Sequence, residues 1–349
     1  MKQFSKKLID WYLKNQRCLP WRLSSNPYHV WLSEIILQQT RVAQGMRYYL
    51  NFVEAFPTVF DLANASEMEV LKLWQGLGYY SRARNLHHTA KVIVTDYNGN
   101  FPNDFETLKK LKGIGDYTAS AIASICFDKP HAVVDGNVYR VLSRYFGIAT
   151  PINTTEGSKA FKVLAQSLID LKQPGTYNQA IMDFGATQCK PKNPLCENCV
   201  LQENCLALRD ATVDALPVKI KKTRITHRYF HYILILNEQQ QFCLQKRTGN
   251  GIWKNLYEFP KIEKEKSSIL TKEEINHHFP GLLIDDFVSY NEKEIEHKLS
   301  HQHLHIRFWI VHSPKGLPVM ISLAELASHP VPVPIQNFIN AFFFKNREN

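Results

Sequence analysis

Four cysteines lie close together in the sequence, and their spacing is typical of a metal site. Cys189, Cys196, Cys199 and Cys205 are separated by six, two and five residues. Thiols clustered this tightly form either a metal site or a set of disulfides. One close pair with two outlying cysteines suits an iron–sulfur cluster better than zinc, which usually takes two close pairs.

Asp135 is the first carboxylate candidate, in the run Asp-Gly-Asn-Val at 135–138. An aspartate there is best explained as a helix N-cap, and it could also face a substrate. Breaking an N-glycosidic bond builds positive charge on the sugar. A nearby carboxylate would stabilise that charge while water acts as the nucleophile. The sequence leaves both roles of Asp135 open.

Glu34 is the second carboxylate candidate, within the segment Trp-Leu-Ser-Glu-Ile-Ile-Leu-Gln-Gln-Thr at 31–40. Three apolar residues follow it at once. A carboxyl group beside apolar surface has its acid form favoured, which suits a general acid that protonates a leaving base. The alternative is an exposed glutamate at the start of a helix.

Two glycines separated by one residue, Gly113 and Gly115, stand between two helical patterns. Glycines let the backbone turn sharply and bring its N–H groups against an anion, and the next helix adds its dipole. Many such turns only connect helices. With helices predicted on both sides, this one resembles a helix–hairpin–helix, which grips the DNA backbone without reading sequence.

Two polar segments could contact nucleic-acid bases. In the glycine-rich segment 76–85, Tyr79 could enter a base stack while Arg82 binds a nearby phosphate. Gln38, Gln39 and Thr40 could form a polar wedge that hydrogen-bonds bases. The alternatives are a tyrosine that packs its loop and a set of surface polar residues.

The elements that must position these residues differ along the chain. Apolar residues recur at helical spacing from Val42 and again from Val138. Residues 210–228 are basic without periodicity, so they form either a linker along a phosphate backbone or a solvated loop. Strand patterns follow at 232–236 and 304–311. We therefore predict a mainly helical region over 1–206, a basic linker over 207–228 and a smaller α/β domain over 229–349.

The composition limits the class of protein. The chain has 349 residues, is 44% hydrophobic and carries a formal net charge of +10, so a polyanionic partner is plausible. No apolar run is long enough for a transmembrane helix, and the first residues lack a signal-peptide core. We expect reduced thiols and a cytoplasmic protein without a membrane partner.

In several segments the chain resembles the MutY-type adenine DNA glycosylases of the endonuclease III superfamily. The segments are LPWR at 19–22, WLSEIILQQT at 31–40, GLGYYSRARNLH at 76–87, DGNVYRVLSR at 135–144 and NQAIMDFGATQC at 178–189, with the glycine turn and the cysteine spacing. The resemblance implies a helical helix–hairpin–helix glycosylase with a 4Fe–4S domain and a C-terminal Nudix-like α/β domain.

The resemblance also implies roles for individual residues. Glu34 matches the general acid and Asp135 the carboxylate that stabilises or traps the sugar cation, while Tyr117 and Asn137 support that step. An adenine pocket is implied by Trp21, Arg22, Leu37 and Gln179. Around 8-oxoguanine the matching residues are Gln39, Thr40 and Tyr79, and DNA contacts are also expected from Gln38, Arg82, Gly113, Gly115, Ser300 and His301.

Two positions refine the expected activity. Superfamily members that also cut the strand carry a lysine at the position of Tyr117, and tyrosine cannot form an imine, so we predict a monofunctional enzyme. The acidic metal-binding signature of Nudix hydrolases is missing after Pro260, so the C-terminal domain is expected to recognise 8-oxoguanine. Leu299 replaces the phenylalanine of the family's Phe-Ser-His loop.

The resemblance implies a monomeric bacterial enzyme, associated with the nucleoid, that removes adenine opposite 8-oxoguanine or guanine in double-stranded DNA. One alternative is a glycosylase for thymine or uracil opposite guanine. Another is a DNA-binding iron–sulfur protein without activity, against which the presence of both Glu34 and Asp135 argues.

Overall fold

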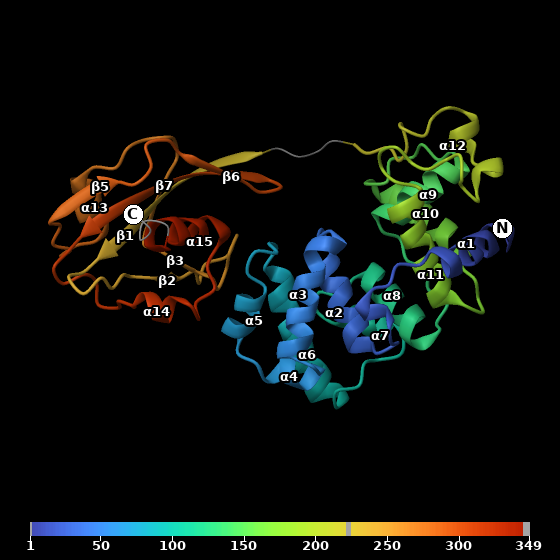
Figure 1. Ribbon diagram of the computed structural model, residues 1–349, viewed down its shortest axis with the longest axis horizontal. Coiled ribbons are helices and arrows are strands. Elements are labelled where there is room, and N and C mark those ends of the chain that lie inside the picture. Colours follow the sequence, from blue (N-terminus) through green and yellow to red (C-terminus); the bar gives the residue numbers. More distant parts are fainter. Residues whose placement is uncertain (1, 221–224, 345–349) are drawn as a thin grey trace. The chain divides into compact units, whose positions relative to one another are not determined.

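The computed structural model describes residues 2–220 and 225–344, which form two compact units (Figure 1). One unit takes the described residues up to 64 and from 85 to 220. The other takes 65–84 and the residues from 225 onward. Lys221, Lys222 and Arg224 of the predicted basic linker lie outside the described residues.

The first unit is helical, as the sequence predicts. Its elements are α1 (Lys2–Asn15), η1 (Pro20–Arg22), α2 (Pro27–Leu37), α3 (Val42–Ala55), α4 (Val59–Asn64), most of α6 (Ser81–Tyr97), α7 (Phe105–Lys110), α8 (Asp116–Phe127), α9 (Gly136–Phe146), α10 (Thr155–Leu168), α11 (Pro174–Asp183), η2 (Phe184–Gln188), η3 (Gln202–Asn204) and α12 (Leu206–Arg209).

Local sequence explains where the helices around the candidate site begin. Asn26 caps α2 by accepting a hydrogen bond from the Tyr28 amide, and Pro27 supplies the first helical residue. Asp135 caps α9 through the amides of Asn137 and Val138. Both α2 and α8 bury residues on nearly every side, so they form the centre of this unit.

The second unit is built on a mixed five-stranded sheet in the order β4-β1-β7-β5, with β6 also paired to β7. The long strands β1 (Thr226–Leu236) and β7 (Gln302–His312) are parallel, with Thr226 opposite Gln302. The antiparallel partners are β4 (Lys261–Lys264), β5 (Asp286–Ser289) and β6 (Ile295–Lys298). A separate pair joins β2 (Gln245–Lys246) to β3 (Tyr257–Glu258).

Both faces of the mixed sheet are covered. On one face, Ile233 and Trp309 pack with Ile275 of α13 (Lys272–His278). On the other, Phe308 stacks at 4.2 Å on Phe338 of α15 (Val333–Ile339). The strand β1 is accordingly buried from Phe230 to Leu236. The unit also contains α14 (Leu323–Leu326) and η4 (Asn340–Phe344).

Residues 65–84, which include α5 (Glu67–Leu73), belong to the second unit through side-chain hydrogen bonds. Asn255 donates to Glu67 at 2.6 Å, and Gln75 donates to Gln336 at 2.7 Å. Because a helical pattern does not reveal its packing partner, the sequence could not place α5. The predicted boundaries at 206 and 229 stay a proposal. Among the described residues, no helix has both the length and the apolar character that a membrane span needs.

Candidate active site

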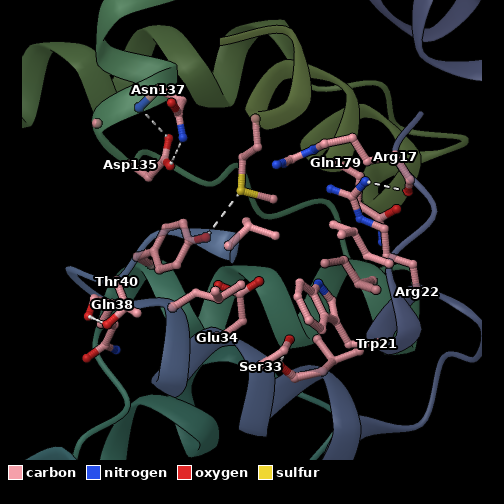
Figure 2. Close-up of a pocket in the computed structure, with 18 of the residues that line it drawn as sticks. Arg17, Trp21, Arg22, Ser33, Glu34, Gln38, Thr40, Asp135, Asn137 and Gln179 are labelled. Carbon is pink, nitrogen blue, oxygen red and sulfur yellow. Dashed lines mark hydrogen bonds between the residues drawn. The ribbon is translucent and has the colours of Figure 1, made fainter. Parts of the chain in front are cut away.

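A cavity of about 400 Å³ opens among α2, α8, α9, α11 and η1 of the first unit. It brings together residues that are up to 165 positions apart in the sequence, from Arg17 to Met182. Its lining includes eleven of the residues selected from the sequence: Trp21, Arg22, Glu34, Leu37, Gln38, Gln39, Thr40, Tyr117, Asp135, Asn137 and Gln179. Figure 2 shows Glu34 and Asp135 entering this cavity from different helices.

Glu34 lies in the second half of α2, and its side chain lines the cavity, whereas the buried apolar residues of α2 pack into the protein. Burial raises the pKa of its carboxyl group to about 7, the charge of Asp135 also raises it, and Tyr117 and Arg22 lower it in part. The carboxyl therefore holds its proton near neutral pH. The sequence-based expectation of a favoured acid form has a physical cause in this structure.

Asp135 caps α9 and also lines the cavity, so its place is compatible with both roles that the sequence left open. Its Oδ1 accepts hydrogen bonds from the amides of Asn137 at 2.9 Å and Val138 at 2.8 Å, while Oδ2 accepts one from Asn137 Nδ2 at 2.7 Å. Burial raises the pKa of the Asp135 carboxyl, and these hydrogen bonds oppose the rise. The N-cap thus holds a carboxylate at the cavity wall.

Tyr117 lies near the start of α8, between the two carboxyl groups and α11. Its hydroxyl donates to Met182 Sδ at 3.2 Å, and burial next to Glu34 and Asp135 raises its pKa well above the ordinary value. The phenol is therefore protonated at neutral pH. It acts as a hydrogen-bonding wall of the cavity.

The opposite part of the cavity combines an aromatic ring with polar groups. Trp21 is buried, and its indole meets Tyr49 edge to face at 5.1 Å. Arg22 forms an ion pair with the buried Asp183, and Gln179 accepts a hydrogen bond from Tyr12 at 2.5 Å. A flat heterocycle with hydrogen-bonding edges fits such a surface.

The sequence analysis missed several residues at the cavity. The lining also includes Arg17 and Met182, and Asp183 lies directly behind Arg17 and Arg22. A signal was present, because Asp183 is a charged residue four positions after Gln179 that follows directly on the apolar run at 180–182. Its partners could not be read from the sequence because they lie more than 160 positions away.

Gln39 occupies the left-handed region of backbone space, with φ of 57°, at the turn between α2 and α3. A side chain with a Cβ costs about 1 kcal/mol or more there, and such strain is often found at functional sites. Gln39 is exposed, whereas Gln38 hydrogen-bonds Thr118 at 3.4 Å and Thr40 bonds the Gln38 carbonyl. The turn therefore displays Gln39 at the cavity.

The glycine turn connects α7 and α8 as predicted. Gly113 has φ of 84°, and a Cβ there would come within 2.8 Å of Asn85. Glycine is thus required at 113 by the fold itself. At Gly115 a Cβ would meet no atom within 4 Å, so the protein does not demand glycine at that position.

A second cavity, of about 430 Å³, lies within the second unit. It is lined by Tyr79, Trp253, Ser300 and His301 among others. Leu299, Ser300 and His301 form the loop of the β6–β7 hairpin, whose turn is closed by the Leu299 amide on the Gln302 carbonyl at 2.8 Å. The sequence segments 76–85 and 299–301 therefore meet in one site.

Tyr79 is displayed at this second cavity with 53% of its side chain exposed and φ of 48°. Arg82 lies beneath the loop, where it is 9% exposed and donates to the carbonyls of Leu77 and Gly78. Arg82 thus supports the loop that carries Tyr79. A direct contact of Arg82 with phosphate stays a prediction.

The four clustered cysteines line a small cavity between η2, η3 and α12. Burial raises the pKa of Cys196, Cys199 and Cys205, and neighbouring thiolates add to the rise. Arg144 of α9 contacts Cys189 Sγ at 3.5 Å and donates to the Lys190 carbonyl at 2.8 Å. Crowded thiols of this kind need a cationic centre to be stable as thiolates.

The cysteine site fits a cluster better than one ion. Within residues 2–220 and 225–344, no group of three or more His, Cys, Asp or Glu side chains could hold a metal ion. In a 4Fe–4S cluster each iron takes one thiolate, so the four sulfurs stand farther apart than around zinc. When bound, the cluster supplies cross-links that hold the loop 189–205.

The raised pKa of Glu34 predicts an effect of Glu34→Gln on stability. Between pH 4.5 and 7 the unfolded chain ionises Glu34 while the native state keeps the proton, so this group lowers stability as pH rises and the loss is complete above pH 7. At pH 8 the variant should be more stable by up to about 3 kcal/mol, and near pH 4 the gain should vanish. Urea unfolding at both pH values measures this; an equal change at both would contradict it.

The cysteine site predicts a loss of iron on substitution. Cys199→Ser should lower bound iron and sulfide well below four each per chain and reduce thermal stability, because the loop 189–205 loses a cross-link. Cys18→Ser, at an exposed cysteine outside the site, is the matched control. Unchanged iron content in Cys199→Ser would remove this residue from the ligand set.

Three family models match the chain. The model described as HhH-GPD superfamily base excision DNA repair protein matches residues 32–166, and the one described as iron–sulfur binding domain of endonuclease III matches 189–205. A NUDIX domain matches residues 231–341. The matches confirm the predicted fold class and the 4Fe–4S cofactor, and the range 189–205 begins and ends at two of the four cysteines, whose role as ligands stays a prediction.

Among solved structures, a thermostable thymine-DNA glycosylase is 30% identical, with a TM-score of 0.55 over 60% of this chain and 96% of that one. A non-covalent endonuclease III–DNA complex has a TM-score of 0.51 at 24% identity, with 60% of this chain and 98% of that one covered. The second likeness shows the fold alone.

Curated relatives extend over both units. Adenine DNA glycosylase of Buchnera aphidicola subsp. Schizaphis graminum is 35% identical over 327 residues, which are 92% of this chain and 88% of that protein. The Homo sapiens adenine DNA glycosylase is 46% identical over 213 residues, 58% of this chain and 39% of that protein. With an acid and a carboxylate in one cavity and a thiol site beside α9, the chain belongs to the adenine DNA glycosylase family, iron–sulfur enzymes that bind DNA and remove adenine in base excision repair.

Proposed function

We propose that the enzyme removes adenine paired with 8-oxoguanine, or with guanine, and that it hydrolyses the glycosidic bond without cutting the strand. The observation that carries the chemical part is the pair Glu34 and Asp135 in one cavity. Their environments differ: one carboxyl is held by burial with a pKa near 7, and the other accepts three hydrogen bonds. Such a pair separates an acid from a carboxylate.

Glu34 begins the reaction as the general acid. Its carboxyl proton goes to N7 of an adenine flipped out of the duplex, so the electrons of the bond between C1′ and N9 can leave with a neutral base. The sugar is left as an oxocarbenium ion. Water then bonds to C1′ and its proton returns to the Glu34 carboxylate, which restores the acid.

Asp135 stabilises the positive charge that develops on the sugar, either as an ion pair or as a short-lived covalent ester. Asn137 supports it in both cases, because its Nδ2 donates to Asp135 while its Oδ1 accepts from Arg140 at 2.9 Å. The amide of Asn137 is therefore fixed in one orientation. Tyr117 bounds the same space with a protonated hydroxyl.

The adenine lies on the opposite part of the cavity in this proposal. Trp21 and Leu37 supply apolar surface, while Gln179 and Arg22 supply hydrogen-bonding groups at the edge. Tyr117 in the position of a strand-cutting lysine supports a monofunctional reaction, because a phenol cannot form an imine with the sugar. An abasic site is then the product.

The enzyme grips DNA through the turn between α7 and α8. The exposed Gly115 leaves room for a phosphate against the backbone amides at the start of α8, and Gly113 lets the chain make the turn before it. Gln39, with Gln38 and Thr40 in the same turn, supplies a polar wedge for the space that the flipped base leaves. The strained backbone at Gln39 supports this role.

The second cavity is the proposed site for 8-oxoguanine. Compared with guanine, 8-oxoguanine has a carbonyl at C8 and an N–H at N7, so a hydroxyl or imidazole can distinguish the two. Ser300 and His301 are exposed, and their side chains contact one another at 3.2 Å. Thr226 fixes the loop by donating to the His301 carbonyl, which leaves both side chains to the ligand.

Aromatic surface in the same cavity supports a purine as the ligand. Tyr79 and Trp253 both have positive φ, 48° and 60°, so two strained loops converge on one site. Tyr79 provides a ring that can stack on a base. Leu299 is half-buried in the hairpin loop, and without an aromatic ring it contributes apolar contact in place of stacking.

The rival function is removal of thymine or uracil opposite guanine, which the likeness to a thymine-DNA glycosylase favours. That likeness covers 60% of this chain, whereas the adenine DNA glycosylase of Buchnera matches 92% and includes the second unit. Gln179 and the second cavity therefore support adenine. We also infer that the enzyme acts as a monomer on the bacterial nucleoid in the cytoplasm, where its DNA substrate lies.

Base release from four duplexes tests the function. We expect release from adenine opposite 8-oxoguanine and opposite guanine, none from thymine or uracil opposite guanine, and strand breaks only after alkali. Glu34→Gln and Asp135→Asn should bind DNA but release adenine about 100-fold more slowly or worse. Glu54→Gln, at an exposed position of α3, is the control. Release of thymine would favour the rival, and near-normal rates in either carboxylate variant would remove that residue from the mechanism.

Point variants test the second cavity better than deletion of residues 229–349, because deletion would also strip residues 65–84 of their packing partner. Ser300→Ala and His301→Ala should each lower the ratio of rates for adenine opposite 8-oxoguanine over guanine by about 2- to 10-fold. Ser328→Ala, exposed in the same unit and outside the cavity, should leave the ratio unchanged. Unchanged ratios in both site variants would move 8-oxoguanine recognition elsewhere.

A further inference from the structure

Asp183 is a fully buried carboxylate at the end of α11 that the proposed reaction does not use. It stands four residues after Gln179, so both side chains lie on one face of α11. That face is the one turned toward the adenine pocket, because Gln179 lines the cavity. A buried charge in this place requires partners, because desolvation of an unpaired carboxylate is costly.

Two arginines bind Asp183 from the same side. Arg22 donates from Nη1 to Oδ2 at 2.7 Å and from Nη2 to Oδ1 at 2.8 Å, which is a bidentate pair. Arg17 donates from Nε to Oδ1 at 2.9 Å, and its backbone amide reaches Oδ2 at 3.3 Å. These bonds lower the pKa of Asp183, so it is ionised at neutral pH.

The bidentate pair limits what Arg22 can do. Its end-on fork points at Asp183, so adenine can receive only the remaining N–H groups of this guanidinium. Arg22 also lies over the ring of Tyr12 at 5.6 Å, and Tyr12 in turn donates to Gln179. Figure 2 shows Arg17, Arg22 and Gln179 gathered on one side of the cavity. Arg22 and Gln179, the two polar groups of the proposed adenine pocket, therefore both contact Tyr12.

The charge count in this corner matters for Glu34. Two guanidinium groups and one carboxylate leave a net charge of +1, and Arg22 acts on Glu34 by lowering its pKa. The other titratable groups that face Glu34 are Tyr117 and Cys126 on α8 and Asp135 before α9. Without Asp183, the net charge of this group near the acid would rise from +1 to +2.

We propose that Asp183 is a positioning residue that holds Arg17 and Arg22 against the end of α11 and balances their charge beside Glu34. The inference rests on the proposed function, since it gives Asp183 a role in keeping the general acid protonated. A merely structural ion pair is the competing explanation. The two differ in their effect on pH dependence, because a structural defect lowers the fraction of active enzyme without moving the titration of Glu34.

The test is the pH dependence of single-turnover adenine release from a duplex with adenine opposite 8-oxoguanine. In the wild-type enzyme the rate should fall as pH rises through about 7, where Glu34 loses its proton. We call the fall of the rate at high pH the basic limb of the profile. In Asp183→Asn this limb should move to lower pH, because the guanidinium charge that Asp183 no longer offsets favours the ionised form of Glu34. A move of about one pH unit gives about a tenfold loss of rate at a fixed pH above the limb.

Two further variants separate charge from position. In Asp183→Asn with Arg22→Gln the released positive charge is gone, so the limb should return to the wild-type position or above it. Asp183→Glu keeps the charge but lengthens the side chain, so its limb should stay in place while the rate falls at every pH. Iron content and thermal melting show whether each variant folds. If Asp183→Asn does not fold, Arg22→Gln decides: loss of this guanidinium should move the limb to higher pH, and an unmoved limb would overturn the inference.

If Asp183→Asn folds and its basic limb lies at the wild-type pH, the inference is overturned. It is also overturned if the limb of the double variant lies at the same pH as that of Asp183→Asn. A wild-type rate in Asp183→Glu, or a limb displaced like that of Asp183→Asn, would also overturn it. A wild-type enzyme that releases no adenine would instead contradict the proposed function. The two failures are thus distinguishable.

Discussion

The site depends on one constraint, which is that the carboxyl group of Glu34 is buried away from bulk water. Glu34 stands in α2, a helix buried on nearly all sides, and it shares a cavity with Tyr117 at the start of α8 and Asp135 at the start of α9. Burial raises its pKa to about 7. An acid that is half protonated near neutral pH can give a proton to a base and recover it in the same cycle. Keeping this carboxyl buried costs stability above pH 7, where it must be ionised away from water, as is common at active sites.

Two helices that share one hydrophobic core, α9 and α11, hold residues of the proposed site. The first residues of α9 bind Asp135 as an N-cap, and farther along the same helix Arg140 and Arg144 bond the carbonyls of Cys189 and Lys190. A cluster bound to the cysteine loop would therefore also fix the loop carbonyls to which Arg140 and Arg144 of α9 are bonded. The helix α11 carries Gln179 and Asp183. In the proposed reaction the bond is broken by the carboxyl groups and not by the cluster.

The sequence predicted well whatever depends on local pattern. The helical and α/β parts, the turn at Gly113, the iron–sulfur cofactor and the family are confirmed, and Glu34 and Asp135 share one cavity. Long-range packing could not be predicted from the sequence. Examples are α5, which belongs to the second unit, and Asp183, which binds Arg17 and Arg22 across more than 160 positions. The loop-supporting place of Arg82 was also not predictable, because the same arginine could face solvent or the carbonyls of Leu77 and Gly78. The residue roles stay a proposal.

The central claim is that the carboxyl of Glu34 in the folded enzyme has its pKa raised to about 7, so that it keeps its proton at pH 6. An infrared titration tests it most directly: the spectrum of Glu34→Gln is subtracted from that of the wild-type protein at each pH, so that the protonated carboxyl of Glu34 remains. The account predicts that this signal persists at pH 6 and disappears through about pH 7. A signal already lost by about pH 5, as for an ordinary glutamate, would contradict the account.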